Sequence, residues 1–437
     1  MCNVNNITVL KYNVIYLLSA LAVALISCEK PGNGDNQGHD TDALPEKEDY
    51  LQAKSPKKGV SFDFGRFPVE DVQLLGPAIS WSYNWAIDTQ IKAQEEFRKN
   101  SLDFCPMIWN GNWDLSRLRA YKQANPQTKY LLAFNEPNLT DQARMTPVQA
   151  AQQWPDVVAA AKELGLKLIS PAMNYGTLPD YHDPYKWLDE FFACDGVSLD
   201  DVDGIAVHCY MGSPAALKNY INGFKKYGKP IWLTEFCNWD NNNISALTQK
   251  NFLVNAITYL ENDPDVFRYA WFIPRGNGDA QCHNSLITSK LPFELTELGE
   301  VFTKMSTFDK TIWYKPGNVI PAEHYSAVEG AVVLSPTSDG NGTLDLSNLV
   351  VGFWAEYQVE ILQDGEYAFE VRYNNYLDSN LELVIDGVVT VPLVLPNSND
   401  TWKTESIELD LKEGRHVLRL YGKRTSSPLL NWFRITK

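Results

Sequence analysis

Short apolar runs alternate with longer helical patterns between Lys57 and about Phe308, and this alternation constrains the fold most strongly. Eight runs occur, at 59–64, 78–83, 104–109, 130–138, 167–171, 205–210, 230–236 and 269–272. Strands that alternate with helices are typical of βαβ units with buried parallel strands. Eight strands in about 250 residues predict a (β/α)8 TIM barrel. A doubly wound sheet is the alternative, but no Gly-rich phosphate loop follows the first run, which disfavours nucleotide binding.

From about Ala322 the pattern changes to alternation of apolar and polar residues. Apolar residues at 355, 357, 359 and 361 fall on one face of a strand, and polar residues fall on the other. The same alternation occurs at 367–373, 381–385, 406–411 and 416–421, with turn residues between these segments. This spacing predicts an all-β sandwich of jelly-roll type. We therefore expect an α/β domain at 57–312 and a β-sandwich at 320–437.

Two of the predicted parallel strands end in a glutamate. Glu136 follows the apolar residues of 130–134, and Pro137 then stops further strand pairing. Glu235 closes the run that begins at Ile231. The carboxyl ends of the strands are where α/β barrels carry catalytic groups. For Glu136 alone, a helix cap is an equal alternative.

A second strand-end carboxylate favours catalysis. Strict alternation places Leu132 and Phe134 on the face of Glu136, and it places Leu233 on the face of Glu235. If those faces point inward, the two carboxylates converge at the top of one barrel. Such a pair suits glycoside hydrolysis, in which retaining enzymes hold two carboxyl groups about 5–5.5 Å apart. The two groups then need different environments, so that one stays ionised and the other protonated.

The sequence around these strands resembles that of glycoside hydrolase family 128, the retaining β-1,3-glucanases of clan A. The matching residues are Ser80-Trp81-Ser82-Tyr83-Asn84-Trp85, Met107-Ile108-Trp109, Phe134-Asn135-Glu136-Pro137-Asn138, Trp232-Leu233-Thr234-Glu235-Phe236 and Ala270-Trp271-Phe272. The resemblance covers Lys57 to about Phe308 and is most specific at the two glutamate strands. It implies an endo-acting enzyme that cuts laminarin-like β-1,3-glucan.

The resemblance also implies roles for individual residues. Glu136 would be the acid/base and Glu235 the nucleophile. Asn135 would hold the sugar 2-hydroxyl, and Tyr210 would donate to the nucleophile. Further substrate-binding candidates are Trp271 as the floor under the reacting sugar, Trp81, Tyr83 and Trp109 as stacking platforms, and His208 beside the cleft. For His208, a core histidine is an equal alternative.

The C-terminal segment resembles a family 6 carbohydrate-binding module, as in Gly352-Phe353-Trp354-Ala355-Glu356-Tyr357 and Leu430-Asn431-Trp432-Phe433-Arg434-Ile435. The resemblance implies that Trp402 stacks on sugar and that Glu323 is the family's opening glutamate. Leu429 stands where an asparagine is expected, and Pro321 replaces a polar residue near the family's structural calcium. A calcium ion in this domain is therefore left open.

The N-terminus predicts export. An apolar run at 14–26 follows Lys11 and is too short to span a bilayer comfortably. It ends at Leu25-Ile26-Ser27-Cys28, which resembles the lipobox of a bacterial lipoprotein. By that resemblance residues 1–27 are a signal peptide, Cys28 carries the lipid, and 28–56 is a flexible tether. The expected location is the outer membrane or surface of a Gram-negative bacterium.

Composition restricts the partners. The 38 basic and 54 acidic residues give a net charge of −16, which argues against nucleic acid as a ligand. No Cys/His spacing matches a zinc site, so we expect catalysis without a metal or cofactor, by a monomer acting on a polysaccharide. A disulfide between Cys237 and Cys282 is left open. Alternatives are a clan A hydrolase of another β-linked polysaccharide and a non-catalytic glycan-binding lipoprotein.

Overall fold

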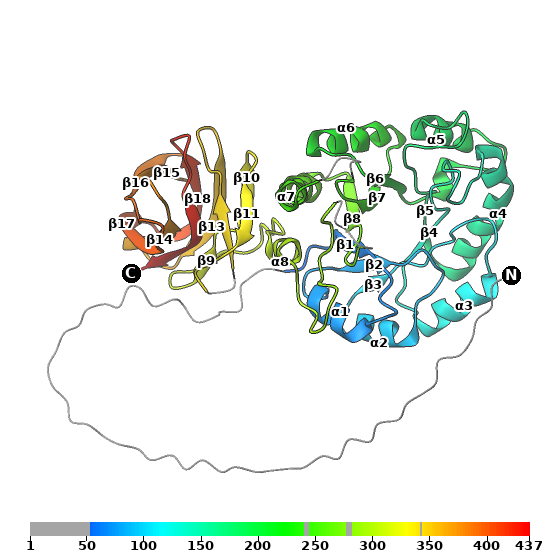
Figure 1. Cartoon of the computed structure of the whole chain (residues 1–437), viewed down its shortest axis with the longest axis horizontal. Coiled ribbons are helices and arrows are strands. Elements are labelled where there is room, and N and C mark those ends of the chain that lie inside the picture. The colour runs from blue at the N-terminus through cyan, green and yellow to red at the C-terminus, as the bar shows by residue number, and fades with distance from the viewer. Residues whose placement is uncertain (1–52, 240–243, 277–281, 341–342) are drawn as a thin grey trace, which may run out of the picture. The chain divides into compact units, whose positions relative to one another are not determined.

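Strands and helices alternate along the first part of the chain, as the sequence pattern predicts (Figure 1). The computed structural model describes residues 53–239, 244–276, 282–340 and 343–437. The predicted signal peptide, Cys28 and most of the predicted tether therefore lie outside the described residues. The strands are β1 (Lys58–Ser61), β2 (Trp81–Tyr83), β3 (Asp103–Phe104), β4 (Tyr130–Leu132), β5 (Lys167–Ile169), β6 (Ile205–Cys209), β7 (Ile231–Phe236) and β8 (Val266–Trp271).

The α-helices that the structure describes are α1 (Pro68–Leu75), α2 (Ile91–Lys99), α3 (Leu115–Ala124), α4 (Pro147–Leu164), α5 (Pro184–Phe192), α6 (Pro214–Phe224), α7 (Ala246–Asn262) and α8 (Glu297–Lys304). Six of these, α3 to α8, begin at a side-chain cap. Helix α4 starts with a capping box between Thr146 and Gln149, has Pro147 in its first turn and ends at left-handed Gly165. Among the described residues, no helix has the length and apolarity needed to cross a bilayer.

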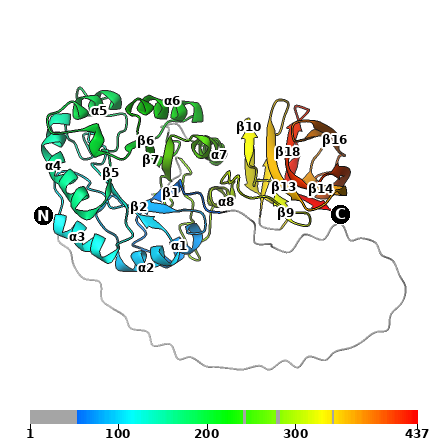
Figure 2. The ribbon, with the colours of Figure 1, turned by 180° about the vertical axis from the view of Figure 1, so that it is seen from behind.

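The eight parallel strands form two sheets rather than one continuous barrel sheet. Six of them pair in the order β3-β2-β1-β8-β7-β6, and β4 pairs with β5. Isolated parallel bridges join the two sheets, one between Met107 and Leu132 and another between Ile169 and Gly204. Pro106 and Pro171 lie beside these junctions, and a proline has no N–H to donate to a ladder. The predicted closed barrel is thus interrupted between β3 and β4 and between β5 and β6. Helices α1 to α7 lie around the strands (Figure 2).

Side chains inside the ring of strands form a core of their own, separate from the core under the helices. This inner cluster consists of Trp81, Tyr83, Cys105, Met107, Leu132, Ile169, Ala172, Ala206, Trp232 and Ala270. The interior is therefore filled with side chains, as in other parallel barrels. Any substrate site has to lie beyond the ends of the strands.

The predicted strict alternation before each glutamate is wrong. Leu132 belongs to the inner cluster, whereas Phe134 and Leu233 belong to the outer core. Register shifts interrupt the pairing of β7 with both neighbours before Glu235, and Glu136 has a left-handed backbone with φ of 43°. A bulge and a positive φ each re-aim a side chain. The two glutamates converge for this reason, not through strand periodicity.

The C-terminal domain consists of antiparallel strands in two sheets, in agreement with the predicted all-β class. One sheet has the order β10-β13-β18-β15-β16, and the other has β11-β12-β19-β14-β17 with β9 on β19. The strands are β9 (Val319–Pro321), β10 (Ala327–Glu329), β11 (Val333–Pro336), β12 (Leu344–Ser347), β13 (Trp354–Ile361), β14 (Gly365–Asn374), β15 (Ser379–Ile385), β16 (Val389–Leu395), β17 (Lys403–Leu411), β18 (Gly414–Gly422) and β19 (Leu429–Thr436). Ala355, Tyr357, Val359 and Ile361 are all buried, as their alternation predicts.

Candidate active site

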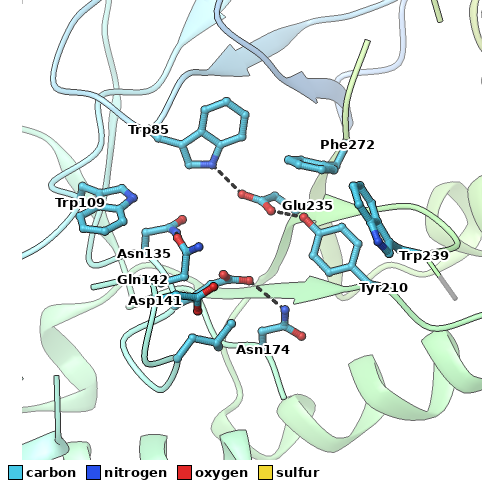
Figure 3. A pocket seen from close by; sticks show the side chains of 12 residues that line it. Trp85, Trp109, Asn135, Asp141, Gln142, Asn174, Tyr210, Glu235, Trp239 and Phe272 are labelled. Carbon is cyan, nitrogen blue, oxygen red and sulfur yellow. Dashed lines mark hydrogen bonds between the residues drawn. The ribbon is translucent and has the colours of Figure 1, made fainter. Parts of the chain in front are cut away.

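A cavity of about 560 Å³ lies at the carboxyl ends of the parallel strands (Figure 3). It is lined by Trp85, Trp109, Asn135, Glu136, Leu139, Asp141, Gln142, Asn174, Tyr210, Glu235, Trp239 and Phe272. Aromatic rings therefore form much of its wall, with the two glutamates between them. Flat apolar walls around a few polar groups are typical of sites that bind sugar rings or other ligands with flat faces.

Glu136 projects from the chain just beyond β4. Its backbone N–H donates to the Ala172 carbonyl at 3.0 Å, which ties it to the segment after β5. Its Oε1 atom accepts hydrogen bonds from Asn174 Nδ2 at 2.8 Å and from His208 Nδ1 at 2.8 Å. Glu136 is only 6% exposed, so these two contacts define its environment.

Glu235, at the end of β7, is surrounded by hydroxyl and indole donors. Its Oε1 atom accepts from Tyr83 Oη and from Trp85 Nε1, each at 2.7 Å. Its Oε2 atom accepts from the Tyr210 hydroxyl. Burial and the negative charge of Glu235 raise the pKa of Tyr83 and of Tyr210 well above the ordinary value. Both tyrosines therefore remain protonated and donate to the Glu235 carboxyl group.

His208, on β6, lies between the two carboxylates and is fully buried. Its Nδ1 atom is 2.8 Å from Glu136 Oε1 and 3.4 Å from Glu235 Oε2. Burial alone lowers the pKa of His208, but the charges of Glu235 and Glu136 outweigh it and raise the pKa above 6.5. Burial likewise raises the pKa of Glu136, and its contacts with His208 and Asn174 reverse this and lower it. The shared proton thus rests on the imidazole, as part of an ion pair.

Asn135 has its amide fixed by a neighbour on the same loop. Its Nδ2 atom donates to Gln142 Oε1 at 3.1 Å. Its Oδ1 atom is buried and has no hydrogen-bond partner, although Asn135 lines the cavity. A buried acceptor without a partner is costly, and a ligand hydroxyl in the cavity could donate to it.

Two predicted sugar contacts lie in the protein interior instead. Trp81 is fully buried, and its Nε1 atom donates to the Lys57 carbonyl at the amino end of β1. Trp271 is fully buried as well, and its indole donates to the Asn284 carbonyl while its ring packs on Phe236. Neither ring can form a wall or floor of the cavity. Tyr83 is also buried, and it touches the nucleophile candidate rather than offering a stacking face.

Several cavity residues escaped the sequence prediction. Phe272 occupies the place expected for Trp271, and Trp239 adds a ring that is 46% exposed. Two hydrogen-bond donors were also missed, namely Asn174, which donates to Glu136, and Trp85, which donates to Glu235. Phe272 ends the predicted strand 269–272, and the other three follow the end of a predicted strand by two or three residues. A search for polar and aromatic residues around strand ends could therefore have found them.

A metal-binding interpretation of this cluster is disfavoured by its donors. Within the described ranges, Glu136, His208 and Glu235 are the one group whose potential ligand atoms lie within 4.8 Å of one another. Oε1 of each glutamate and Oε2 of Glu235 already accept hydrogen bonds from N–H or O–H groups. The arrangement therefore suits two carboxylates that act on a substrate directly.

In the C-terminal domain, the two predicted sugar contacts have different environments. Trp402 is half-buried, and its Nε1 atom donates to Ser338 Oγ at 3.0 Å. Glu323 is 1% exposed, and its Oε1 atom accepts from the Leu344 backbone N–H at 3.0 Å. Glu323 therefore contacts the domain interior and cannot touch a bound sugar. Burial raises the pKa of Glu323 to about 8.

The proposed disulfide is absent from this structure, because Cys237 carries a free thiol. Its sulfur accepts a hydrogen bond from Asn284 Nδ2 at 3.8 Å. Burial raises the pKa of Cys237 well above the ordinary value, so the thiol stays protonated and unreactive.

Comparison with known proteins defines the class. The family model described as "Glycosyl hydrolase catalytic core" matches residues 59–302, which is more than half of the chain. The protein therefore belongs to this family and is a glycoside hydrolase by family. Residues 321–437 match the model "Carbohydrate binding module (family 6)".

Individual relatives are more specific. The chain is 38% identical to a GH128 (subgroup II) endo-beta-1,3-glucanase from Pseudomonas viridiflava, with 57% of this chain and 98% of that chain covered and a TM-score of 0.52. A second such enzyme, from Sorangium cellulosum, is 36% identical, with 56% and 97% covered and a TM-score of 0.49. Alkali-sensitive linkage protein 1 of Schizosaccharomyces pombe is 29% identical over 262 residues, which are 57% of this chain. The chain spans only 44% of the length of that curated relative.

Proposed function

We propose that this protein hydrolyses β-1,3-glucan internally and with retention of configuration. The observation that carries the proposal is the arrangement of Glu136, His208 and Glu235, whose ligand atoms all lie within 4.8 Å of one another beside the cavity. Such a short separation suits direct attack by one carboxylate, whereas inverting enzymes leave about 6.5–9.5 Å for a water molecule. The choice of β-1,3-glucan is supported by the similarity to the Pseudomonas viridiflava enzyme.

In this mechanism Glu235 is the nucleophile. The donors Tyr83, Trp85 and Tyr210 fix the plane of its carboxylate. Attack on the anomeric carbon forms a covalent glycosyl-enzyme, which splits one difficult step into two easier ones. As the bond forms, negative charge leaves Glu235.

Glu136 is the acid and then the base. Asn174 and His208 hold its Oε1 atom. The proton that the leaving group needs starts on His208, because the pKa of His208 is raised and that of Glu136 is lowered. It passes from His208 Nδ1 to Glu136 Oε1 and from there to the glycosidic oxygen as the bond to the leaving group breaks. After departure of the leaving group, Glu136 takes a proton from the attacking water.

The Asn135 amide has a place in this mechanism. With its Nδ2 atom engaged by Gln142, its unpartnered Oδ1 atom accepts from the sugar 2-hydroxyl. A hydrogen bond that tightens as charge develops on the sugar lowers the barrier. The rings of Trp85, Trp109, Trp239 and Phe272 would hold sugar units along the cavity wall.

The test is incubation of the purified protein with laminarin, followed by chromatography of the products. A ladder of short oligosaccharides supports endo-cleavage of β-1,3-glucan. Release of products from a β-1,4-glucan, xylan or mannan but not from laminarin would overturn the linkage. Proton NMR of the first products distinguishes the anomers, and initial release of the α-anomer would contradict retention.

We also propose the finer architecture behind the site. The eight parallel strands would act as a (β/α)8 barrel, supported by the bridges at Met107–Leu132 and Ile169–Gly204 that connect the two sheets. The C-terminal pair of antiparallel sheets would be a jelly-roll. In the first domain the two parallel sheets would close into one barrel, and in the second the two antiparallel sheets would be connected as a jelly-roll.

For the C-terminal domain we propose sugar binding through Trp402. Support comes from the match to the carbohydrate-binding module family and from the half-buried ring at the start of β17. Trp402→Ala in the full-length chain should weaken retention on insoluble β-1,3-glucan and leave hydrolysis of a short soluble substrate unchanged. Equal retention of the variant and the parent protein would contradict this role.

For the cell we propose an exported, monomeric protein anchored through lipid on Cys28, on the surface of a Gram-negative bacterium. The basis is the lipobox-like sequence before Cys28. Partition into detergent should depend on Cys28 and be lost in Cys28→Ser. A soluble parent protein after expression in a host that modifies lipoproteins would overturn the anchor.

A further inference from the structure

We propose that Trp85 is a positioning residue for the nucleophile, acting through its indole N–H. The inference rests on the proposed function, since it assigns Glu235 the attacking role. Trp85 Nε1 donates to Glu235 Oε1 at 2.7 Å, alongside the Tyr83 hydroxyl at the same distance. Tyr83 and Trp85 are thus two neutral donors to the same oxygen of Glu235.

The turn after β2 is built to present this indole. Asn84 Oδ1 accepts from the Ala86 backbone N–H at 3.2 Å, and Asn84 Nδ2 donates to the Asp88 carbonyl at 3.1 Å. Between these contacts, Trp85 has a φ of 60°. The left-handed region is rarely adopted by a bulky residue, and such strain persists only where surrounding contacts hold it.

Ring packing then fixes the direction of the N–H. The indole lies edge-on to Tyr83, with ring centroids 5.5 Å apart, and to Phe272 at 6.1 Å. Figure 3 shows the N–H directed at the Glu235 carboxylate while the remaining ring lines the cavity. Trp85 therefore joins two tasks, since its edge holds the nucleophile and its face remains available to the substrate.

This contact has a specific chemical consequence. A hydrogen bond from an N–H to a charged acceptor is short and directional, so it fixes the position of the Glu235 oxygen. Loss of the donor frees the carboxylate to rotate away from the line of attack. This effect acts on the chemical step rather than on substrate binding.

The test replaces the indole N–H with minimal change of shape. Trp85→Phe removes the donor and keeps a ring, and incorporation of benzothienylalanine at position 85 keeps the two-ring shape with sulfur in place of N–H. For both proteins we expect kcat on laminarin to fall about 10- to 100-fold, with KM within about two-fold for the isostere. Trp109→Phe, in the same cavity, should raise KM and change kcat less than the isostere does.

An unchanged kcat in the folded isostere would overturn the inference. A readout independent of activity separates this failure from failure of the proposed function. In NMR spectra with labelled tryptophan, the indole resonance that disappears in Trp85→Phe should shift strongly on Glu235→Gln. If the parent protein cleaves no glucan but this resonance shifts, the hydrogen bond stands and the proposed reaction fails. If the resonance does not respond to Glu235→Gln, the positioning role fails.

Discussion

The cavity of the α/β domain and the interior of the β-domain both bury carboxyl groups, yet they treat them differently. Glu235 has three N–H or O–H donors, and Glu136 has an imidazole and an amide. Glu323, in the β-domain, accepts from the Leu344 backbone N–H at Oε1, and its Oε2 atom is buried without a partner. Glu136 and Glu235 line the cavity at the strand ends, and Glu323 is not part of that lining. Burial alone therefore does not define a site, whereas several aimed donors beside a cavity do.

The strongest test of this comparison removes the charges in the cavity. Glu136→Gln and Glu235→Gln should each lower kcat on laminarin at least about a thousand-fold, because each amide keeps the shape but can neither attack nor transfer a proton. Circular dichroism should show both variants folded. Glu163→Gln, on the exposed surface of α4, is the matched control and should retain activity. Near-normal turnover in either cavity variant would contradict the assignment of roles.

A smaller effect is expected from His208→Asn, which keeps a donor near Glu136 but removes one site for the shared proton. The active form needs one proton on the Glu136–His208 pair. Because either residue can carry that proton, the pair keeps it to higher pH than Glu136 would alone. The raised pKa of His208 thus places the alkaline limb of the profile above pH 6.5. In the variant that limb should move to lower pH, with kcat/KM reduced about 10- to 100-fold.

His182→Asn provides the control for this experiment, since His182 is exposed and lies outside the cavity lining. Its pH profile should match that of the parent protein. An alkaline limb that stays in place in His208→Asn would show that His208 does not share the catalytic proton.

In the β-domain, replacing the buried Glu323 by glutamine should increase stability at alkaline pH. Burial raises the pKa of Glu323 from 4.5 to about 8. The stability that its protonated form contributes to the fold is therefore fully present below pH 4.5 and is lost as the pH rises towards 8. Glu323→Gln stays neutral, so at pH 8 it should unfold at a higher temperature than the parent. Its free energy of unfolding at that pH should be higher by at most about 4 kcal/mol. Near pH 4 the two proteins should unfold alike. Exposed Glu413→Gln is the control.

The smallest expected effect is that of a chelator. Because the cavity carboxylates are occupied by hydrogen-bond donors, EDTA should leave the rate of laminarin hydrolysis unchanged. Thermal unfolding of the β-domain provides the second readout. A lower unfolding temperature in EDTA, restored by calcium, would show that Glu323 and neighbouring oxygens hold a cation rather than a proton.

Much of the fold was predictable because it depends on local patterns. The alternation of apolar runs and helical segments predicted the α/β class, and period-two alternation predicted the β-domain. The start of α4 followed from Thr146 and Pro147. Closure of the barrel sheet was predicted without interruption, but prolines beside β3 and β5 break the ladders. The effect of a proline on pairing depends on which neighbour it faces, and that is a tertiary property.

The site divides in the same way. The sequence by itself determined that Glu136 and Glu235 end parallel strands, and parallel strands necessarily present their carboxyl ends at one edge. Tertiary structure decided which side chains surround them. A bulge in β7 and a positive φ at Glu136 aim the carboxylates, and the buried positions of Trp81 and Trp271 leave Trp85 and Phe272 to line the cavity. These outcomes depend on packing among residues distant in sequence, which no local pattern records.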